Sequence, residues 1–386
     1  MYSICIEMRD KYIYADNAAT TKLDVSAFET MKPYLLDEYG NPSSLYSISR
    51  GNKKVLKNSR EVIANCIGAK SWEIYFTSGG TESDNWAIKG VASKYKDRGN
   101  HIITSKIEHH AVLHSCEFLE NQGFEVTYLD VDEKGNIRLE ELLKSIRKST
   151  ILISIMLANN EIGTIENISE LVAVAHENNI LFHCDAVQAV GHIPINVNEL
   201  GIDLLSASAH KFNGPKGIGF LYKHSDVEIN AHMSGGGQEF GNRAGTENVA
   251  AIVGMTTALK NNYNNIEKYN LHLDNLTRVF DGEMQRQQID YILNGSLNRL
   301  PGNRNISIKG YDGEMLLHRL DLKGIAISTG SACNSKNTEV SHVIKAIAVP
   351  NEYAQGTIRI TFGKENTEKE VLKIVESLCE ICKKGS

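Results

Sequence analysis

The sequence predicts an α/β fold, with a large domain built on a mostly parallel sheet flanked by helices and a smaller α+β domain after it. Short apolar runs alternate with helical patterns between residues 73 and 222, which is the order expected for repeated β-α-β units. The composition becomes more polar by about residue 261, and short strand patterns then mix with helical ones. We therefore expect a large domain at residues 18–259 and a small one at residues 260–386, which the N-terminal segment 1–17 joins.

The composition is that of an ordinary globular chain, and it excludes several classes of partner. The 386 residues are 41% hydrophobic and 23% charged, which is typical of soluble domains. A net charge of −6 gives no basic surface for nucleic acid, and no apolar run approaches the roughly 20 residues that span a bilayer. Residues 1–11 are too short and too charged for a signal peptide. Seven cysteines without regular spacing indicate a reducing compartment, so we expect a cytoplasmic protein.

The order of the expected elements agrees with this fold. We expect an N-terminal strand at residues 12–21, and in the large domain strands at residues 73–76, 101–104, 124–129, 151–156, 180–184, 204–207 and 218–222. Helices are expected at residues 25–39, 51–66, 109–122 and 139–147, from near residue 81, and from about residue 247. The small domain is expected to contain strands at residues 305–308 and 325–328 and helices at residues 313–323 and 367–382. Helices between successive strands are the connections that a parallel sheet requires.

A lysine lies in a turn between two of these strands. Lys211 follows the strand at residues 204–207, and Gly214, Pro215 and Gly217 break the chain before the next strand begins. A lysine that is desolvated in such a turn can lose its charge and act as an amine nucleophile towards a carbonyl cofactor. Taken alone, the position also fits a solvated surface lysine.

An aspartate precedes this lysine by 26 residues and also stands at a strand end. Asp185 closes the apolar run at residues 180–184, and open α/β sheets bind ligands at the carboxyl ends of their strands. Pyridoxal phosphate needs a carboxylate beside its pyridinium nitrogen and a lysine for the Schiff base. Asp185 and Lys211 supply that pair, so we expect pyridoxal 5'-phosphate as the cofactor. The alternative is that Asp185 caps the start of a following helix.

A glycine-rich turn follows the strand at residues 73–76. Gly79 and Gly80 lead into a helix that is expected to begin near Thr81. Backbone N–H groups that glycine leaves accessible, together with the positive end of a helix, form a binding site for a phosphate. Thr81 and Asp84 also fit a capping box, which would be a purely structural reason for this pattern.

Several motifs together resemble one enzyme family. SASAHKFNGPKG (residues 206–217), HCDAVQAVG (183–191) and TSGGTESDN (77–85) are similar to motifs of the class V, fold-type-I pyridoxal phosphate enzymes. Within that family the resemblance is to the cysteine desulfurases of the NifS/IscS kind. It extends from YIYADNAATT near Tyr12 to TIRITFGK around Arg359, which is nearly the whole chain. It implies the fold of a fold-type-I pyridoxal-phosphate-dependent transferase.

The resemblance also implies roles for individual residues. It places His109 over the cofactor ring, where an imidazole titrating near neutral pH would also move a proton. Arg359 would bind the carboxylate of the substrate, and Thr246 would reach the cofactor phosphate of a neighbouring subunit in a homodimer. The remaining cofactor ligands implied by the resemblance are Gly80, Thr81, Asn160, Gln188, Ser208 and His210, of which Asn160 also faces the substrate. The structural alternatives are turn-forming asparagines, a surface glutamine, solvated histidines and a surface-strand arginine.

A cysteine in a polar stretch is the expected nucleophile. Cys333 lies in TGSACNSKNTE (residues 329–339), which has no apolar stripe to bury it, whereas most cysteines are buried and inert. The resemblance implies that Cys333 receives sulfur as a persulfide. Cys379 and Cys382 lie three residues apart on one face of an expected helix, so we expect them to be buried and predict no metal site.

The expected activity follows from these motifs. The resemblance implies conversion of L-cysteine to L-alanine, with the sulfur carried on Cys333 and passed to an acceptor protein of iron–sulfur cluster assembly or of tRNA or cofactor thiolation. Another class V enzyme, such as a selenocysteine lyase or an aminotransferase, is the nearest alternative. A non-catalytic scaffold that retains the fold is an alternative of another class, which the presence of Lys211, Asp185, His109 and Cys333 weighs against.

Overall fold

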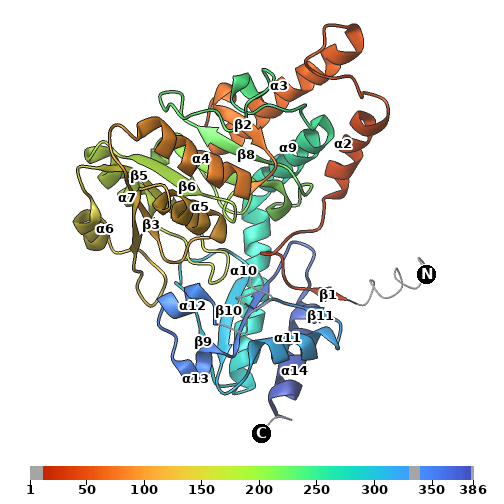
Figure 1. Ribbon diagram of the computed structural model, residues 1–386. Coiled ribbons are helices and arrows are strands. Elements are labelled where there is room, and N and C mark those ends of the chain that lie inside the picture. Colours follow the sequence, from red (N-terminus) through yellow and green to blue (C-terminus); the bar gives the residue numbers. More distant parts are fainter. Residues whose placement is uncertain (1–11, 330–339, 384–386) are drawn as a thin grey trace.

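Seven strands form the central sheet of the structure, a computed structural model that describes residues 12–329 and 340–383 (Figure 1). In spatial order they are β2 (Ile74–Thr77), β8 (Gly219–Lys223), β7 (Leu204–Ser208), β6 (Leu181–Asp185), β5 (Thr150–Met156), β3 (His101–Ser105) and β4 (Glu125–Leu129). Strand β8 runs antiparallel to both of its neighbours, and the other pairings are parallel. The prediction of a mostly parallel sheet is confirmed.

Helices cover both faces of this sheet, as the alternation of side chains along its strands requires. On β7, Leu204 packs into the core under α4 (Gly80–Tyr95) and α5 (His110–Glu120). The next residue, Leu205, packs into the core on the opposite face. That second core also receives side chains from α2 (Val25–Leu36), α3 (Ser47–Ile67), α6 (Leu139–Ser145), α7 (Ile168–Glu177), α8 (Val197–Leu200) and α9 (Val249–Asn264). Because successive residues of a strand point to opposite faces, each buried strand contributes to both cores.

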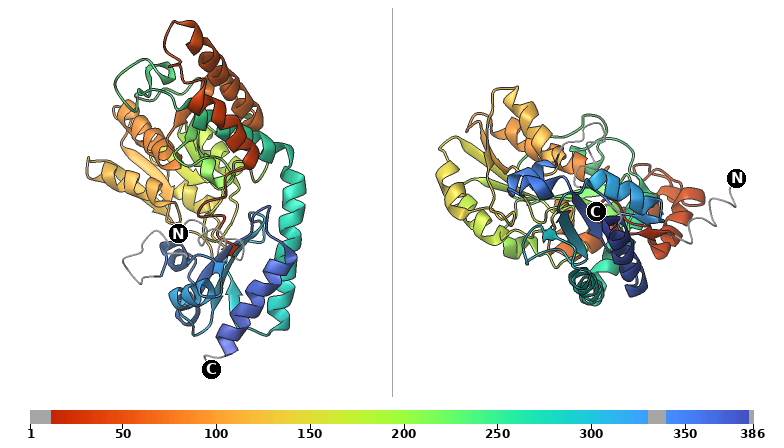
Figure 2. Two further views of the ribbon diagram at one scale, coloured as in Figure 1. Left: turned by 90° about the vertical axis from the view of Figure 1, so that its right-hand side faces the viewer. Right: turned by 90° about the horizontal axis from the view of Figure 1, so that it is seen from below.

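A second, smaller body lies beside the sheet (Figures 1 and 2). Its antiparallel sheet has the order β12 (Thr357–Thr361), β10 (Asn303–Ile308) and β9 (Tyr291–Leu293). Strand β1 (Ile13–Tyr14) pairs in parallel with β11 (Ile325–Ala326), which brings the N-terminal segment into this body. Its helices are α10 (Ile266–Arg286), α11 (Gly313–Asp321) and α14 (Glu368–Lys383), and two short helices, α12 (His342–Ala346) and α13 (Asn351–Ala354), lie between them along the chain.

The two bodies have separate hydrophobic cores. Along the chain, Leu259 of α9 is the last residue of the large core before Leu273 of α10 enters the small one. Ala15, next to β1, also belongs to the small core. The domain division near residue 260, with segment 1–17 joined to the C-terminal part, stays a prediction.

Several helix bounds differ from those expected. Helix α3 begins at Ser47, so Gly51 lies inside it, and it ends where Gly68 takes a left-handed conformation with φ of 73°. The expected long helix from residue 247 is divided at Asn265 into α9 and α10.

Within the described ranges, no helix combines the length and apolar character needed to cross a membrane.

Candidate active site

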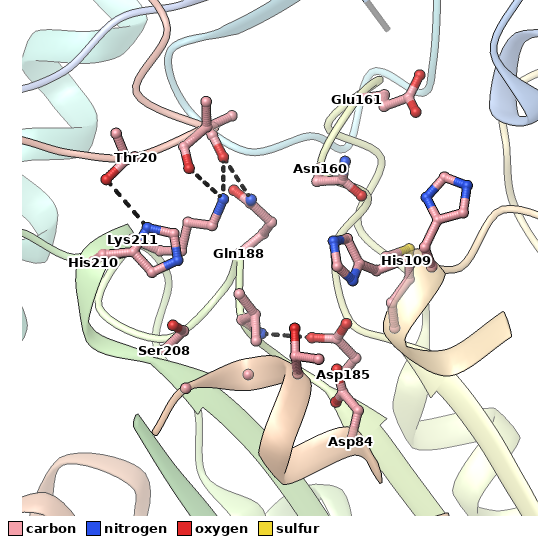
Figure 3. A pocket seen from close by; sticks show the side chains of 18 of the residues that line it. Thr20, Asp84, His109, Asn160, Glu161, Asp185, Gln188, Ser208, His210 and Lys211 are labelled. Carbon is pink, nitrogen blue, oxygen red and sulfur yellow. Dashed lines mark hydrogen bonds between the residues drawn. The ribbon is translucent and has the colours of Figure 1, made fainter. Parts of the chain in front are cut away.

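A cavity of about 710 Å³ lies where the large sheet faces the small body (Figure 3). The last residues of three parallel strands, Met156 of β5, Asp185 of β6 and Ser208 of β7, line it. Eight further residues expected at the site also line it: Gly80, Thr81, His109, Asn160, Gln188, His210, Lys211 and Arg359. The structure therefore brings together residues that are up to 279 positions apart. The carboxyl ends of the parallel strands meet at one edge of the large sheet, and Arg359 reaches the same cavity from β12 of the small sheet.

Lys211 is held over this cavity by the N-terminal segment. It is the last residue of the short helix η2 (Ala209–Lys211), and its Nζ donates to the carbonyl oxygens of Ala18 and Ala19 at 2.5 and 2.9 Å. The buried ring of His192 contacts the backbone oxygen of Lys211 through Nε2 at 2.8 Å. The side chain of Lys211 is half-buried, so a fully solvated surface lysine is not what the structure contains.

Asp185 is buried at the floor of the cavity, and it does not cap a helix. Its Oδ1 accepts the backbone N–H of Val187 at 2.9 Å, which forms a local turn, and the next helix along the chain begins only at Val197. Burial raises the pKa of Asp185 to about 6, while the Val187 N–H and the charge of Lys211 act in the opposite direction. A buried carboxylate of this kind needs a positively charged partner, which a pyridinium nitrogen would provide.

The turn before α4 leaves room for an anion close to the backbone. Gly79 has φ of 150°, and a Cβ added to Gly80 would lie 2.5 Å from Cγ2 of Val187, so neither position accepts a larger residue without strain. Glu82 accepts the backbone N–H of Ser78, while Thr81 remains exposed at the first turn of α4. The helix N-terminus points into the cavity with its partial positive charge.

The capping box expected from Thr81 and Asp84 is absent. The N-cap residue of α4 is Gly79, which has no side chain to accept a hydrogen bond. Asp84 instead faces the sheet, is 1% exposed and lies beside Asp185 in Figure 3. This second buried carboxylate was not expected from the sequence, although its spacing of four residues from Gly80 places both on one face of α4.

His109 is a neutral imidazole in this site. It is the N-cap of α5, and its Nδ1 accepts the backbone N–H of Ala111 at 3.1 Å. Burial lowers the pKa of His109 to about 4, and the charge of Lys211 lowers it further. The titration near neutral pH expected from the sequence is therefore wrong for this arrangement. With Nδ1 occupied as an acceptor, the ring presents Nε2 as a donor, so it is poorly suited to take a proton from a thiol.

Two other expected residues are fixed by the N-terminal segment. Gln188 donates through Nε2 to the carbonyl oxygen of Ala18 at 3.0 Å. His210 contacts the hydroxyl of Thr20 through Nδ1 at 3.2 Å, and burial together with Lys211 lowers its pKa to about 4. Residues 18–20 of this segment line the cavity themselves.

Arg359 reaches the cavity from the small sheet and is buried, so it is not a surface-strand arginine. One terminal nitrogen of its guanidinium donates to the carbonyl oxygen of Asn160 at 2.9 Å, and the other bonds Oδ1 of Asp16 at 2.7 Å. Both Asn160 and Arg359 line the cavity, so a cation and an amide from different bodies meet there. Asp16 was not singled out from the sequence, because its partner lies 343 residues away.

Glu161 is a further residue that sequence analysis missed. It is buried next to Asn160, and its Oε2 accepts the hydroxyl of Ser341 at 2.6 Å, which itself caps α12. Burial raises the pKa of Glu161 to about 7, against the opposing effects of the Ser341 hydrogen bond and Arg359. This contact attaches the start of α12 to the large body beside the cavity.

The last residues singled out from the sequence are Cys333, Thr246, Cys379 and Cys382. Cys333 lies outside the described residues. Thr246 is exposed and does not line the cavity of its own chain. Cys379 is buried and Cys382 half-buried on α14, and burial raises the pKa of the Cys382 thiol to about 11. In the part of the chain that the structure describes, no group of three or more histidines, cysteines and carboxylates could hold a metal ion.

Comparisons with known proteins agree with the fold. The family described as Aminotransferase class-V matches residues 13–374. Cysteine desulfurase IscS of Dictyoglomus turgidum is 52% identical over 95% of this chain and 94% of its own. Cysteine desulfurase IscS of Methanosarcina thermophila is 50% identical over 98% of this chain and 94% of its own.

Solved structures give the same result. A NifS-like protein superposes with a TM-score of 0.91 at 37% identity, over 96% of this chain and 99% of its own. A structure of SspA in complex with cysteine superposes with a TM-score of 0.81 at 36% identity, over 92% of this chain and all of its own. The chain belongs to the class-V aminotransferase family, whose enzymes depend on pyridoxal phosphate. Within that family it is a cysteine desulfurase of the IscS/NifS type.

Proposed function

We propose that the cavity binds pyridoxal 5'-phosphate and L-cysteine, and that the sulfur of the substrate is transferred to Cys333. The observation that carries this proposal is the placement of Asp185 and Lys211 at the ends of neighbouring strands, on one cavity. Asp185 would hold its negative charge against the ring nitrogen, and Lys211 would bond the aldehyde carbon through Nζ. Gln188 would donate to the ring oxygen, with His109 lying against the ring.

The phosphate would lie at the first turn of α4. Gly80 and Thr81 offer backbone N–H groups there, and Ser208 and His210 line the same part of the cavity. Ser208 Oγ lies 3.4 Å from the position of a Cβ on Gly79, so the glycine turn and the serine hydroxyl are adjacent. These residues fit a phosphate because helix N-termini and hydroxyl donors both favour an anion.

When bound, the cofactor supplies a carbonyl for an amino group and a protonated ring that accepts the electron pair from the α-carbon of the substrate. Arg359 and Asn160 orient the substrate by binding its carboxylate. Lys211, once its Nζ is released as a free amine, removes the proton from the α-carbon. The half-buried cavity excludes bulk water and so strengthens each of these charge interactions.

The sulfur transfer is the step that defines the activity. The thiolate of Cys333 attacks the sulfur of the substrate, the bond between that sulfur and the β-carbon breaks, and a persulfide remains on Cys333. The carbon fragment takes up a proton and leaves as L-alanine, so cysteine and the enzyme thiol yield alanine and the enzyme persulfide.

A selenocysteine lyase or an aminotransferase on this scaffold would leave no sulfur on Cys333. An acceptor protein, for iron–sulfur assembly or thiolation, then takes the sulfur in the cytoplasm.

The cofactor assignment can be tested by chemical trapping. Borohydride reduction of the protein incubated with pyridoxal phosphate should fix the cofactor covalently on one peptide, identified by mass spectrometry as the one that contains Lys211. The control is Lys216→Ala, because Lys216 lines the same cavity from the same turn and should not affect the modification. Modification at another lysine, or none, would contradict the assignment.

We also propose that the active form is a homodimer with shared sites. Thr246 is exposed, and its loop is fixed to its own subunit by the ion pairs of Arg243 with Glu82 and of Glu239 with Arg60. Mixing an inactive Lys211 variant with an inactive Thr246 variant should restore part of the activity, since a mixed dimer contains one intact site. Sedimentation should give twice the chain mass. A monomer with full activity would refute the shared site.

A further inference from the structure

A polar cluster lies in the otherwise apolar layer between α4 and the central sheet. Strands β5, β6 and β7 each place a polar side chain under α4, and these are Ser154, His183 and Ser206. His183 and Asp185 point to the same face because they are two residues apart on β6. Asp84 approaches this face from α4, one turn after Gly80.

The histidine of this cluster is satisfied by its neighbours. His183 is fully buried, and its Nδ1 and Nε2 lie 2.8 Å and 3.0 Å from the hydroxyls of Ser154 and Ser206. Burial lowers the pKa of His183 to about 3, so the ring is neutral. It therefore supplies no positive charge to the carboxylate of Asp84, whose Oδ1 lies 3.6 Å from Nε2.

Asp84 is hydrogen-bonded by the side chain of Ser206, which acts to lower its pKa, but this contact does not satisfy the whole carboxylate. It is 1% exposed, and its Oδ1 has no hydrogen-bond donor among the described residues. The charged or titratable groups that face it are Asp185 and Glu108, both acidic, besides the neutral His183 and the buried thiol of Cys184. An ionised carboxylate in this place would be desolvated and close to another negative charge, which is strongly unfavourable.

Asp185 has a more favourable environment for a negative charge. Both carboxyl groups line the cavity, but Asp185 also accepts the N–H of Val187 and feels the positive charge of Lys211. Two neighbouring buried carboxyl groups cannot both ionise easily, so one of them keeps a proton. The group whose surroundings stabilise a negative charge less well is the one that stays protonated. Burial and Asp185 both raise the pKa of Asp84 well above its ordinary value, which agrees with this assignment.

We propose that Asp84 is a positioning residue that keeps a proton, so that the single negative charge of the pair stays on Asp185, facing the cavity. The inference rests on the proposed role of Asp185 and assigns Asp84 no contact with cofactor or substrate. A protonated Asp84 has a hydroxyl to donate, as the neutral acid beside an ionised one does in other sites where two carboxyl groups are paired. The pair therefore holds its charge ready for a pyridinium nitrogen before any ligand enters.

Infrared spectroscopy can detect this proton directly. The purified full-length protein, with its aspartate carboxyl groups labelled with ¹³C, should show at neutral pH the carbonyl band of a protonated carboxylic acid that shifts with the label. The label excludes Glu108, which is also buried with a raised pKa. The band should be lost in Asp84→Asn and retained in Asp185→Asn. A band that persists in Asp84→Asn, or its absence from the wild-type protein, would overturn the proposal.

Cofactor affinity provides a second measurement. Asparagine mimics the neutral acid, so Asp84→Asn should bind pyridoxal phosphate nearly as tightly as the wild type, whereas Asp185→Asn should bind roughly 30-fold more weakly or worse because a buried charge pair is lost. Equal losses in both variants would contradict a protonated Asp84. Because the infrared band requires no bound cofactor, its result is independent of the borohydride test of the Lys211 assignment.

Discussion

Lys211→Ala should lose the visible absorption of the lysine-bound cofactor and all measurable turnover of L-cysteine. The substitution removes both the covalent attachment and the amine that takes the α-proton, and the lost proton transfer alone is worth about 10²- to 10⁴-fold in rate. The fold should survive, because the side chain is half-buried and contributes two hydrogen bonds, to Ala18 and Ala19, rather than core packing. The absorption spectrum and the release of alanine are the measurements.

Lys216→Ala is the matched control for this variant. Lys216 lines the same cavity and belongs to the same turn, but it is exposed. It should keep the absorption band and most of the activity. If Lys211→Ala retained both the band and turnover, another residue would hold the cofactor and the assignment of the whole site would fail.

Cys333→Ala should bind pyridoxal phosphate normally, change its spectrum on addition of L-cysteine, and release essentially no alanine. In the proposed mechanism Asp185 and Lys211 carry out cofactor binding and proton removal, so these steps do not need the thiol, whereas breaking the carbon–sulfur bond needs a nucleophile. After brief exposure to cysteine, mass spectrometry of the wild type should find one additional sulfur on the peptide that contains Cys333.

The control for this prediction is Cys382→Ala. Cys382 is half-buried in the core of the small body, where burial raises its pKa to about 11, so its thiol is not reactive at neutral pH. This variant should form the persulfide as the wild type does. Wild-type turnover by Cys333→Ala would instead favour the aminotransferase-like alternative.

The parts of the site at strand ends could be predicted from the sequence. Asp185 and Lys211 follow short apolar runs, and the alternation of strands and helices already placed both at the carboxyl edge of a parallel sheet. Gly79 and Gly80 were predictable for a similar reason, since a turn that requires glycine leads directly into a helix. In each case, a local pattern determines which way the residue points.

Other parts depend on neighbours that the sequence does not bring together. Asp84 fits a helix cap locally, and only the packing of α4 on β6 shows that it lies beside Asp185. The neutral state of His109 depends on burial and on Lys211, which is 102 residues further along the chain. Thr246 is exposed and does not line the cavity of its own chain, so its proposed contact with a cofactor depends on a partner subunit.

The strap formed by residues 16–21 has a consequence for how the protein is made. Asp16 bonds Arg359 across 343 residues, and Ala18 and Ala19 accept from Lys211 across 193 and 192 residues. The strap residues are synthesised well before their partner on β12, and chain synthesis proceeds at about 5–20 residues per second. The large body can fold earlier, whereas the strap finds its final position only when the chain is nearly complete. The contact between Asp16 and Arg359 can therefore form only after β12 has been synthesised.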